Sequence, residues 1–168
     1  GDGYVLSGQK SVVLNGESAD KFFVTARTAG GTRDENGIGV FLVDAGADGV
    51  SVRGYRTQDG ARAAEITFDK VKVGKDDVFG DAENGLPLVR RVVDAGIAAL
   101  AAESIGVMSA MHQQTVDYLK VRKQFGVPIG QFQVLQHSAV DMFVAIEQAR
   151  SITLYATMMA DAEDADER

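Results

Sequence analysis

Two different hydrophobic patterns divide the chain. Up to about residue 83, short runs of β-branched and aromatic residues recur: Tyr4–Leu6, Ser11–Leu14, Phe22–Thr25, Gly39–Val43 and Ala64–Phe68. Asn-Gly, Gly-Gly and Asp-Gly pairs separate these runs and are typical of tight turns. The spacing predicts an antiparallel β-sandwich or barrel-like domain. Because no strand-like run alternates with a helical pattern, a doubly wound nucleotide-binding fold is disfavoured.

After residue 84 the apolar positions repeat every three or four residues. This period predicts one long helix over 86–121, with Pro87 in its first turn, and a second over 132–160. Two long helices joined by a short loop should pack antiparallel, as half of a four-helix bundle. The fold class is therefore α+β, with domains at 1–83 and 84–168. The acidic segment 161–168 is interpreted as a solvated, frayed tail.

Both predicted helices carry apolar faces that are wider than one partner helix could cover. The faces around Ile105, Met108, Val140 and Ile146 are expected to be buried against another copy of the chain. The sequence opens with Gly1-Asp2-Gly3, without an initiator Met and as if within a hairpin. We interpret it as a piece of a longer protein.

Composition excludes several classes of function. The chain has 17 Lys and Arg against 24 Asp and Glu, a net charge of −7, and no basic cluster, which disfavours nucleic acid and anionic membranes as partners. No run of about 18 apolar residues predicts a membrane span. Without cysteine, and with only His112 and His137, no disulfide, thiol nucleophile or metal site is expected. A cytoplasmic location is predicted.

No catalytic constellation stands out from spacing alone. The chain has no Gly-x-Gly-x-x-Gly motif, phosphate loop or nucleophile elbow. His137 is interpreted as a core or interface residue and His112 as a solvated helix residue. Glu103 and Glu147 are expected to be solvated or ion-paired.

The segment 121–133 is more informative, and two interpretations of it are about equally supported. In the first, basic residues and a glycine simply end a helix, and the loop is plugged into the core by Phe125, Ile129 and Phe132. In the second, Arg122 offers a planar fork of donors to a phosphate, with Gln124 and Gln133 as amide donors nearby.

A family resemblance favours the second interpretation. The sequence Arg-Lys-Gln-Phe-Gly-Val-Pro-Ile-Gly-Gln-Phe-Gln-Val-Leu-Gln (122–136), followed by Ala-Val-Asp-Met (139–142), closely resembles the signature of the acyl-CoA dehydrogenases. Upstream segments that resemble the middle domain of the family follow in the same order and at matching distances: 8–20, 38–43 and 68–73. The resemblance covers nearly the whole chain. Relative to the family, the N-terminal helical domain and the last two helices of the C-terminal bundle are missing.

The resemblance implies an FAD-dependent enzyme of fatty-acid β-oxidation. Such enzymes are homo- or heterotetramers, built as dimers of dimers, that desaturate an acyl-CoA between Cα and Cβ. A glutamate takes the α-proton, the flavin takes the β-hydride, and electrons pass to an electron-transferring flavoprotein. Arg122 matches the arginine that binds the FAD pyrophosphate of a neighbouring subunit. The channel for its adenosine diphosphate is matched by Gln124, Phe125 and Gln133, with apolar walls at Ile129, Phe132 and Leu135. The helix beside the acyl-CoA is matched by Asp94, Ala95, Gly96 and Ile97.

Several positions depart from the family pattern. A flavin-contacting Trp and Thr are replaced by Val12 and Leu14, and an arginine by Ile97. Gly96 stands where one branch of the family has its catalytic glutamate, so no catalytic residue is assigned, and the chain alone is expected to be inactive. The segment 59–64 lacks the family's phosphate-binding serine.

These departures resemble the smaller subunits of bacterial two-subunit acyl-CoA dehydrogenases, such as pimeloyl-CoA dehydrogenase. Two alternatives therefore stay open. One is a non-catalytic subunit that supplies part of a partner's FAD site. The other is a flavin oxidase or monooxygenase on the same fold.

Overall fold

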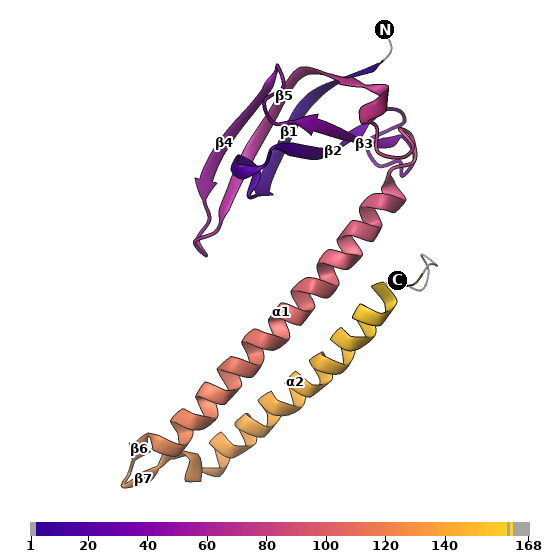
Figure 1. The fold of residues 1–168 in the computed structure, drawn as a ribbon. Helices are drawn as coiled ribbons and strands as arrows, with labels where there is room; N and C mark the ends of the chain where they lie inside the picture. The colour runs from indigo at the N-terminus through magenta and orange to yellow at the C-terminus, as the bar shows by residue number, and fades with distance from the viewer. Residues whose placement is uncertain (1–2, 161, 163–168) are drawn as a thin grey trace. The chain divides into compact units, whose positions relative to one another are not determined.

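The computed structural model describes residues 3–160 and 162 of the chain and contains two compact units, 1–89 and 90–168 (Figure 1). The first unit holds five strands: β1 (Gly3–Leu14), β2 (Lys21–Arg27), β3 (Ile38–Asp44), β4 (Val50–Arg56) and β5 (Arg62–Gly74). They form two antiparallel sheets, one ordered β1-β5-β4 and the other β2-β3. Single turns of 3₁₀ helix follow β1 (Gly16–Ser18) and β5 (Lys75–Asp77). The antiparallel β-domain is as predicted.

Two details of this unit differ from the prediction. The runs at 4–6 and 11–14 belong to one strand, β1, whose register with β5 shifts twice, between Leu6 and Gly8 and between Lys10 and Val13. The strand β4 was missed, because its sequence Val-Ser-Val-Arg-Gly-Tyr-Arg is exposed at most positions and shows no clear apolar alternation. Its pairing with β5, from Val50 opposite Phe68 to Arg56 opposite Arg62, makes it a strand despite that pattern.

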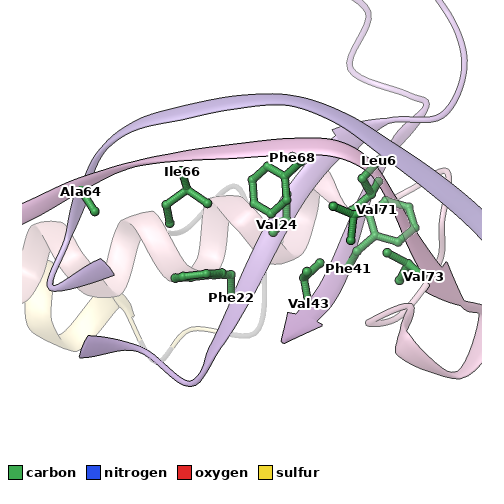
Figure 2. Close-up of a cluster of buried hydrophobic side chains, with 10 residues drawn as sticks. All are labelled: Leu6, Phe22, Val24, Phe41, Val43, Ala64, Ile66, Phe68, Val71 and Val73. Carbon is green, nitrogen blue, oxygen red and sulfur yellow. The ribbon is translucent and has the colours of Figure 1, made fainter. Parts of the chain in front are cut away.

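The core of the first unit lies between its two sheets. Figure 2 shows Ile66 and Phe68 of β5 turned toward Phe22 and Val24 of β2. Phe41 of β3 is fully buried. The other members of this cluster are Leu6, Val43, Ala64, Val71 and Val73. Alternate residues of β5 therefore face the core, which leaves those between them on the outer face of the three-stranded sheet.

Two long helices form most of the second unit: α1 (Leu86–Val121), whose first residues belong to the first unit, and α2 (Gln133–Ala160). They run antiparallel side by side (Figure 1), as predicted, and polar contacts join them. The His112 ring donates from Nε2 to the Ala139 carbonyl at 3.1 Å, and Arg150 Nη2 donates to Ser109 Oγ at 3.4 Å. The predicted tail, 161–168, lies outside the described residues apart from Ala162.

The interface between α1 and α2 buries few side chains. Ala98, Ile105 and Ile146 are buried, whereas many large apolar side chains stay exposed. On α1 these include Val93, Ile97, Leu100, Val107, Met111 and Tyr118, and on α2 Val140, Phe143, Ile152 and Tyr155. Ile105 and Ile146 are already buried within this chain. That the faces around Ile105, Met108, Val140 and Ile146 are covered by another copy stays a prediction. Val140, 58% exposed, remains available to a partner.

One part of α1 is long and apolar enough, by length and composition only, to cross a membrane. The sequence pattern had not indicated such a stretch. Helices at the centre of water-soluble bundles satisfy the same test, so this stretch by itself does not argue for a membrane partner.

Candidate functional site

A tight hairpin connects the two long helices. Its strands are β6 (Lys123–Gln124) and β7 (Val127–Pro128), and a 3₁₀ turn (Ile129–Gln131) leads into α2. Phe125 and Gly126 form the two-residue loop, with φ of 54° and 82°. Positive φ at both loop positions is the signature of a type I′ turn, whose twist matches that of paired strands.

Phe125 occupies this turn at an energetic cost. A side chain with a Cβ in the left-handed region costs about 1–2 kcal/mol, and asparagine or glycine is the usual choice there. The ring is 91% exposed and forms an edge-to-face contact with the Phe132 ring, at a centroid distance of 6.1 Å. The interpretation that Phe125 plugs the loop into the core is therefore wrong. A strained, exposed aromatic residue instead indicates a surface built for contact.

The base of the hairpin is fixed to the end of α1. The Ile129 N–H donates to the Arg122 carbonyl at 2.8 Å, and Gln136 Nε2 donates to the Gly130 carbonyl at 2.8 Å. A Cβ added to Gly130 would come within 2.9 Å of the Leu119 carbonyl oxygen. Only glycine permits this close approach, so the loop is held in one place although its tip is exposed.

Arg122 is the first residue after α1, and its side chain is exposed. Its backbone N–H donates to the Tyr118 carbonyl at 2.9 Å. Among residues 3–160 and 162, its guanidinium has no hydrogen-bond or ion-pair partner. Gln124 and Gln133 are also exposed, and Gln133 is the first residue of α2, whose N-terminal dipole favours an anion.

The structure thus gathers all seven predicted cofactor-binding residues around one loop. The polar ones, with Phe125, are exposed, and the apolar ones are half-buried or partly exposed: Ile129, Leu135 and Phe132. This arrangement can offer donors to a phosphate and an aromatic face to a planar group.

The predicted substrate-binding residues lie elsewhere on α1. Asp94 is half-buried, and Ala95, Gly96 and Ile97 are exposed. Along a helix, the 25 residues from Ile97 to Arg122 span about 38 Å. One copy of the chain therefore holds the two groups of residues far apart. A Cβ at Gly96 would meet nothing within 4 Å, so the chain itself leaves room there.

Val12 and Leu14, which the family resemblance aligns with flavin-contacting residues, lie at the end of β1 and are 58% and 71% exposed. Val12 has φ 55°, an outlier for a β-branched residue. It belongs to a bulge in which Ser11 and Val12 stand opposite Glu65 of β5.

Glu65 was not singled out by sequence reasoning. Hydrogen bonds from the Ser11 hydroxyl, then from Tyr55, lower the pKa of the Glu65 carboxyl. Tyr55 donates its hydroxyl to Glu65 Oε1 at 3.0 Å, and partial burial raises the pKa of this tyrosine. The sequence offers one indication of its importance, which is a single carboxylate between two apolar residues, Ala64 and Ile66.

Of the four residues expected to have no catalytic role, the two histidines differ from the prediction. Glu147 pairs with Arg150 at 3.2 Å, as expected. His112 is not solvated, because it is half-buried between the helices and lies 6.0 Å from the Phe143 ring. It lines an apolar groove of about 210 Å³ with three methionines, Met108, Met111 and Met142. His137 is exposed and so is not a core residue of this chain.

Comparison with known sequences decides the family. The profile "Acyl-CoA dehydrogenase, middle domain" matches residues 1–71, and "Acyl-CoA dehydrogenase, C-terminal domain" matches residues 83–168. The chain belongs to the acyl-CoA dehydrogenase family. It is 33% identical over 165 residues to the short-chain specific acyl-CoA dehydrogenase of Clostridium acetobutylicum, covering 96% of this chain and 43% of the relative. It is also 33% identical to the short/branched chain specific enzyme of Bos taurus, covering 96% and 38%.

Solved structures agree with this assignment. Glutaryl-coenzyme A dehydrogenase in its glutaryl-CoA complex superposes with a TM-score of 0.83 at 27% identity, over 93% of this chain and 40% of that one. Butyryl-CoA dehydrogenase from Megasphaera elsdenii gives 0.81 at 28%, over 90% and 40%. An FAD complex of PigA gives 0.82 at 27%, over 89% and 40%. This acyl-CoA dehydrogenase chain thus spans about two-fifths of the length of these relatives, and the predicted fold class is confirmed.

Proposed function

We propose that this chain forms the middle and first C-terminal part of an FAD-dependent enzyme that desaturates an acyl-CoA at Cα–Cβ. Family membership supports the reaction class, and FAD is supported by the FAD complex among the structural neighbours. The observation that carries the proposal is the hairpin after α1, where an exposed guanidinium, two exposed amides and a strained, exposed phenylalanine lie together.

The residues of this loop fit the adenosine-diphosphate half of FAD. Arg122 can meet a pyrophosphate with two parallel hydrogen bonds, and Gln124 and Gln133 can donate from their amides. Phe125 offers a ring face to adenine. When bound, the flavin itself would accept the hydride, and the chain's part is to hold its distal half.

The separation along α1 suggests that this loop serves another subunit. About 38 Å of α1 separates Ile97 from Arg122, which follows the helix, and this is too far for both to serve one flavin and its substrate. An assembly in which Arg122 reaches the FAD of a neighbour removes this difficulty. The exposed apolar side chains of α1 and α2 supply surface for such an assembly.

Substitution of Arg122 tests the cofactor role. In the full-length protein, Arg122→Lys keeps the charge and loses the planar fork, whereas Arg122→Ala loses both. We expect FAD affinity to fall in that order, by about tenfold for each 1.4 kcal/mol lost. Lys123→Ala, one residue further on and also exposed, is the matched control and should bind FAD as the wild type does. Equal dissociation constants for the wild type and Arg122→Ala would exclude the cofactor role.

A second function is favoured by Val12, Leu14 and Gly96. These residues lack the aromatic ring, hydroxyl and carboxylate that the family places near the reacting atoms. A non-catalytic subunit that lends Arg122 to a partner's FAD would need none of those three groups. Anaerobic flavin reduction by an acyl-CoA, measured on the protein alone and with its partner subunit, separates the two functions. Reduction by the protein alone supports the dehydrogenase.

The remaining expectations concern partners. An electron-transferring flavoprotein as electron acceptor fits the proposed reaction, and a solved structure titled for such a flavoprotein is among the neighbours, at 30% identity and a TM-score of 0.83. Acyl-CoA as substrate follows from the proposed reaction class. The predicted cytoplasmic location stays a prediction.

A further inference from the structure

A polar cluster centred on Glu65 occupies the outer face of the three-stranded sheet. Ala64 and Ile66, its neighbours on β5, face the core in Figure 2, so Glu65 points to the opposite face. Its carboxylate accepts hydrogen bonds from Gln9 Nε2 at 3.1 Å and from the Tyr55 hydroxyl at 3.0 Å.

The same carboxylate also binds the backbone of β1. The Val12 N–H donates to Glu65 Oε1 at 3.4 Å, and the Ser11 hydroxyl hydrogen-bonds to Glu65 as well. Ser11 and Val12 are the two bulge residues, since Lys10 pairs with Ile66 and Val13 with Ala64. A bulge leaves one N–H outside the ladder, and here the Glu65 side chain accepts it.

The bulge determines how β1 ends. Val12 is held at φ 55°, a conformation that costs about 1–3 kcal/mol and persists only where its surroundings impose it. An extra residue in a strand changes which face the later side chains occupy, so the bulge sets the directions of Val12 and Leu14. Both side chains are exposed although they are apolar.

We propose that Glu65 is a positioning residue: by fixing the bulge at Ser11–Val12 it holds Val12 and Leu14 as the apolar surface on which the flavin ring rests. This inference rests on the proposed function. Every partner that Glu65 has among residues 3–160 and 162 is a donor, and an ionised carboxylate, which only accepts, satisfies all of them at once. Tyr55 is itself held in place, because the Arg53 guanidinium lies 5.9 Å from the centre of its ring.

Three variants of the full-length protein test the inference. Glu65→Ala removes every acceptor and should release the bulge. Glu65→Gln keeps one acceptor oxygen, which can still serve the Val12 N–H, and should retain much of the function. Asp59→Asn is the matched control, because Asp59 sits in the β4–β5 turn of the same sheet and, within the described residues, hydrogen-bonds to Thr57 and Ala61 of that turn.

The readouts are the FAD dissociation constant, the melting temperature of the apoprotein and the hydrogen-exchange rate of the Val12 amide. We expect Glu65→Ala to weaken FAD binding by about tenfold and to speed exchange at Val12, with Glu65→Gln between it and the wild type. Asp59→Asn should match the wild type in affinity and at Val12.

Two results would overturn the inference while leaving the proposed function intact. One is wild-type affinity in Glu65→Ala. The other is a loss of affinity that only follows a lower melting temperature, with no change at Val12, since that would make Glu65 a stabilising residue only. If the wild type itself binds no FAD, the proposed function fails, and the inference fails with it.

Discussion

Replacing Phe125 by asparagine tests separately what the strained hairpin turn costs in stability and what the aromatic ring contributes to FAD binding. Asparagine followed by Gly126 is the favoured dipeptide of a type I′ turn. The substitution relieves part of the 1–2 kcal/mol that a left-handed phenylalanine costs, but it loses the edge-to-face contact with Phe132, worth about 0.5–1.5 kcal/mol. Because the ring is 91% exposed, almost no buried area is lost. The free energy of unfolding should therefore change by less than about 1 kcal/mol.

Phe125→Ala is the matched comparison. It loses the same ring contact and keeps a Cβ in the left-handed region, so it should be less stable than Phe125→Asn by about 1 kcal/mol. In a domain of 150–250 residues, that corresponds to a difference of about 2–4 °C in melting temperature. Both variants lose the aromatic face and should bind FAD about 5- to 150-fold more weakly, since stacking on a base contributes about 1–3 kcal/mol.

The measurements are thermal unfolding of the apoprotein and titration with FAD. A loss of more than about 2 kcal/mol in Phe125→Asn would show that the ring stabilises the fold, against its exposure in the structure. Unchanged FAD affinity in both variants would show that the strained turn has no part in cofactor binding.

The other predictions concern stability and use denaturant unfolding. Gly130→Ala should destabilise the chain by about 1–3 kcal/mol, because its Cβ would collide with the Leu119 carbonyl; wild-type stability would show that the loop moves freely. Gly96→Ala should stabilise α1 by about 0.5–1 kcal/mol, since space is open there and alanine favours helix; a destabilised variant would mean that another part of the protein fills this space. Phe41→Ala should cost about 3–5 kcal/mol through the cavity it leaves in the β-sandwich, and a cost below 1 kcal/mol would contradict the packing described. Because the pKa of Glu65 is lowered in the folded protein, the unfolded chain binds more protons in mild acid. The stability that this group contributes is therefore present above pH about 4–5 and is lost as the pH falls through the lowered pKa. Glu65→Gln should flatten that part of the profile of stability against pH, and an unchanged profile would contradict the assignment.

Local sequence patterns were enough to predict the order of the helices and most of the strands, and to pick out the candidate site. Helices 86–121 and 132–160 were predicted almost to the residue, because long apolar periods bounded by Pro87 and a glycine-containing turn leave little ambiguity. The residues of the loop after α1 were found by their family pattern, since they are neighbours in sequence as well as in space. Local information was enough in both cases.

Contacts between distant parts of the chain set the features that local patterns do not show. β4 exists because β5 pairs with it, and the alternation within β4 does not show this. The bulge at Ser11–Val12 arises from register with a strand some 50 residues later, and Glu65 matters only because that register brings its carboxylate to the Val12 N–H. Phe125 lies in the loop as expected, but its ring is exposed and not buried in the core, because the type I′ turn directs it outward. Strand pairing and side-chain burial depend on contacts between residues far apart in sequence, so a local pattern of residues does not predict them.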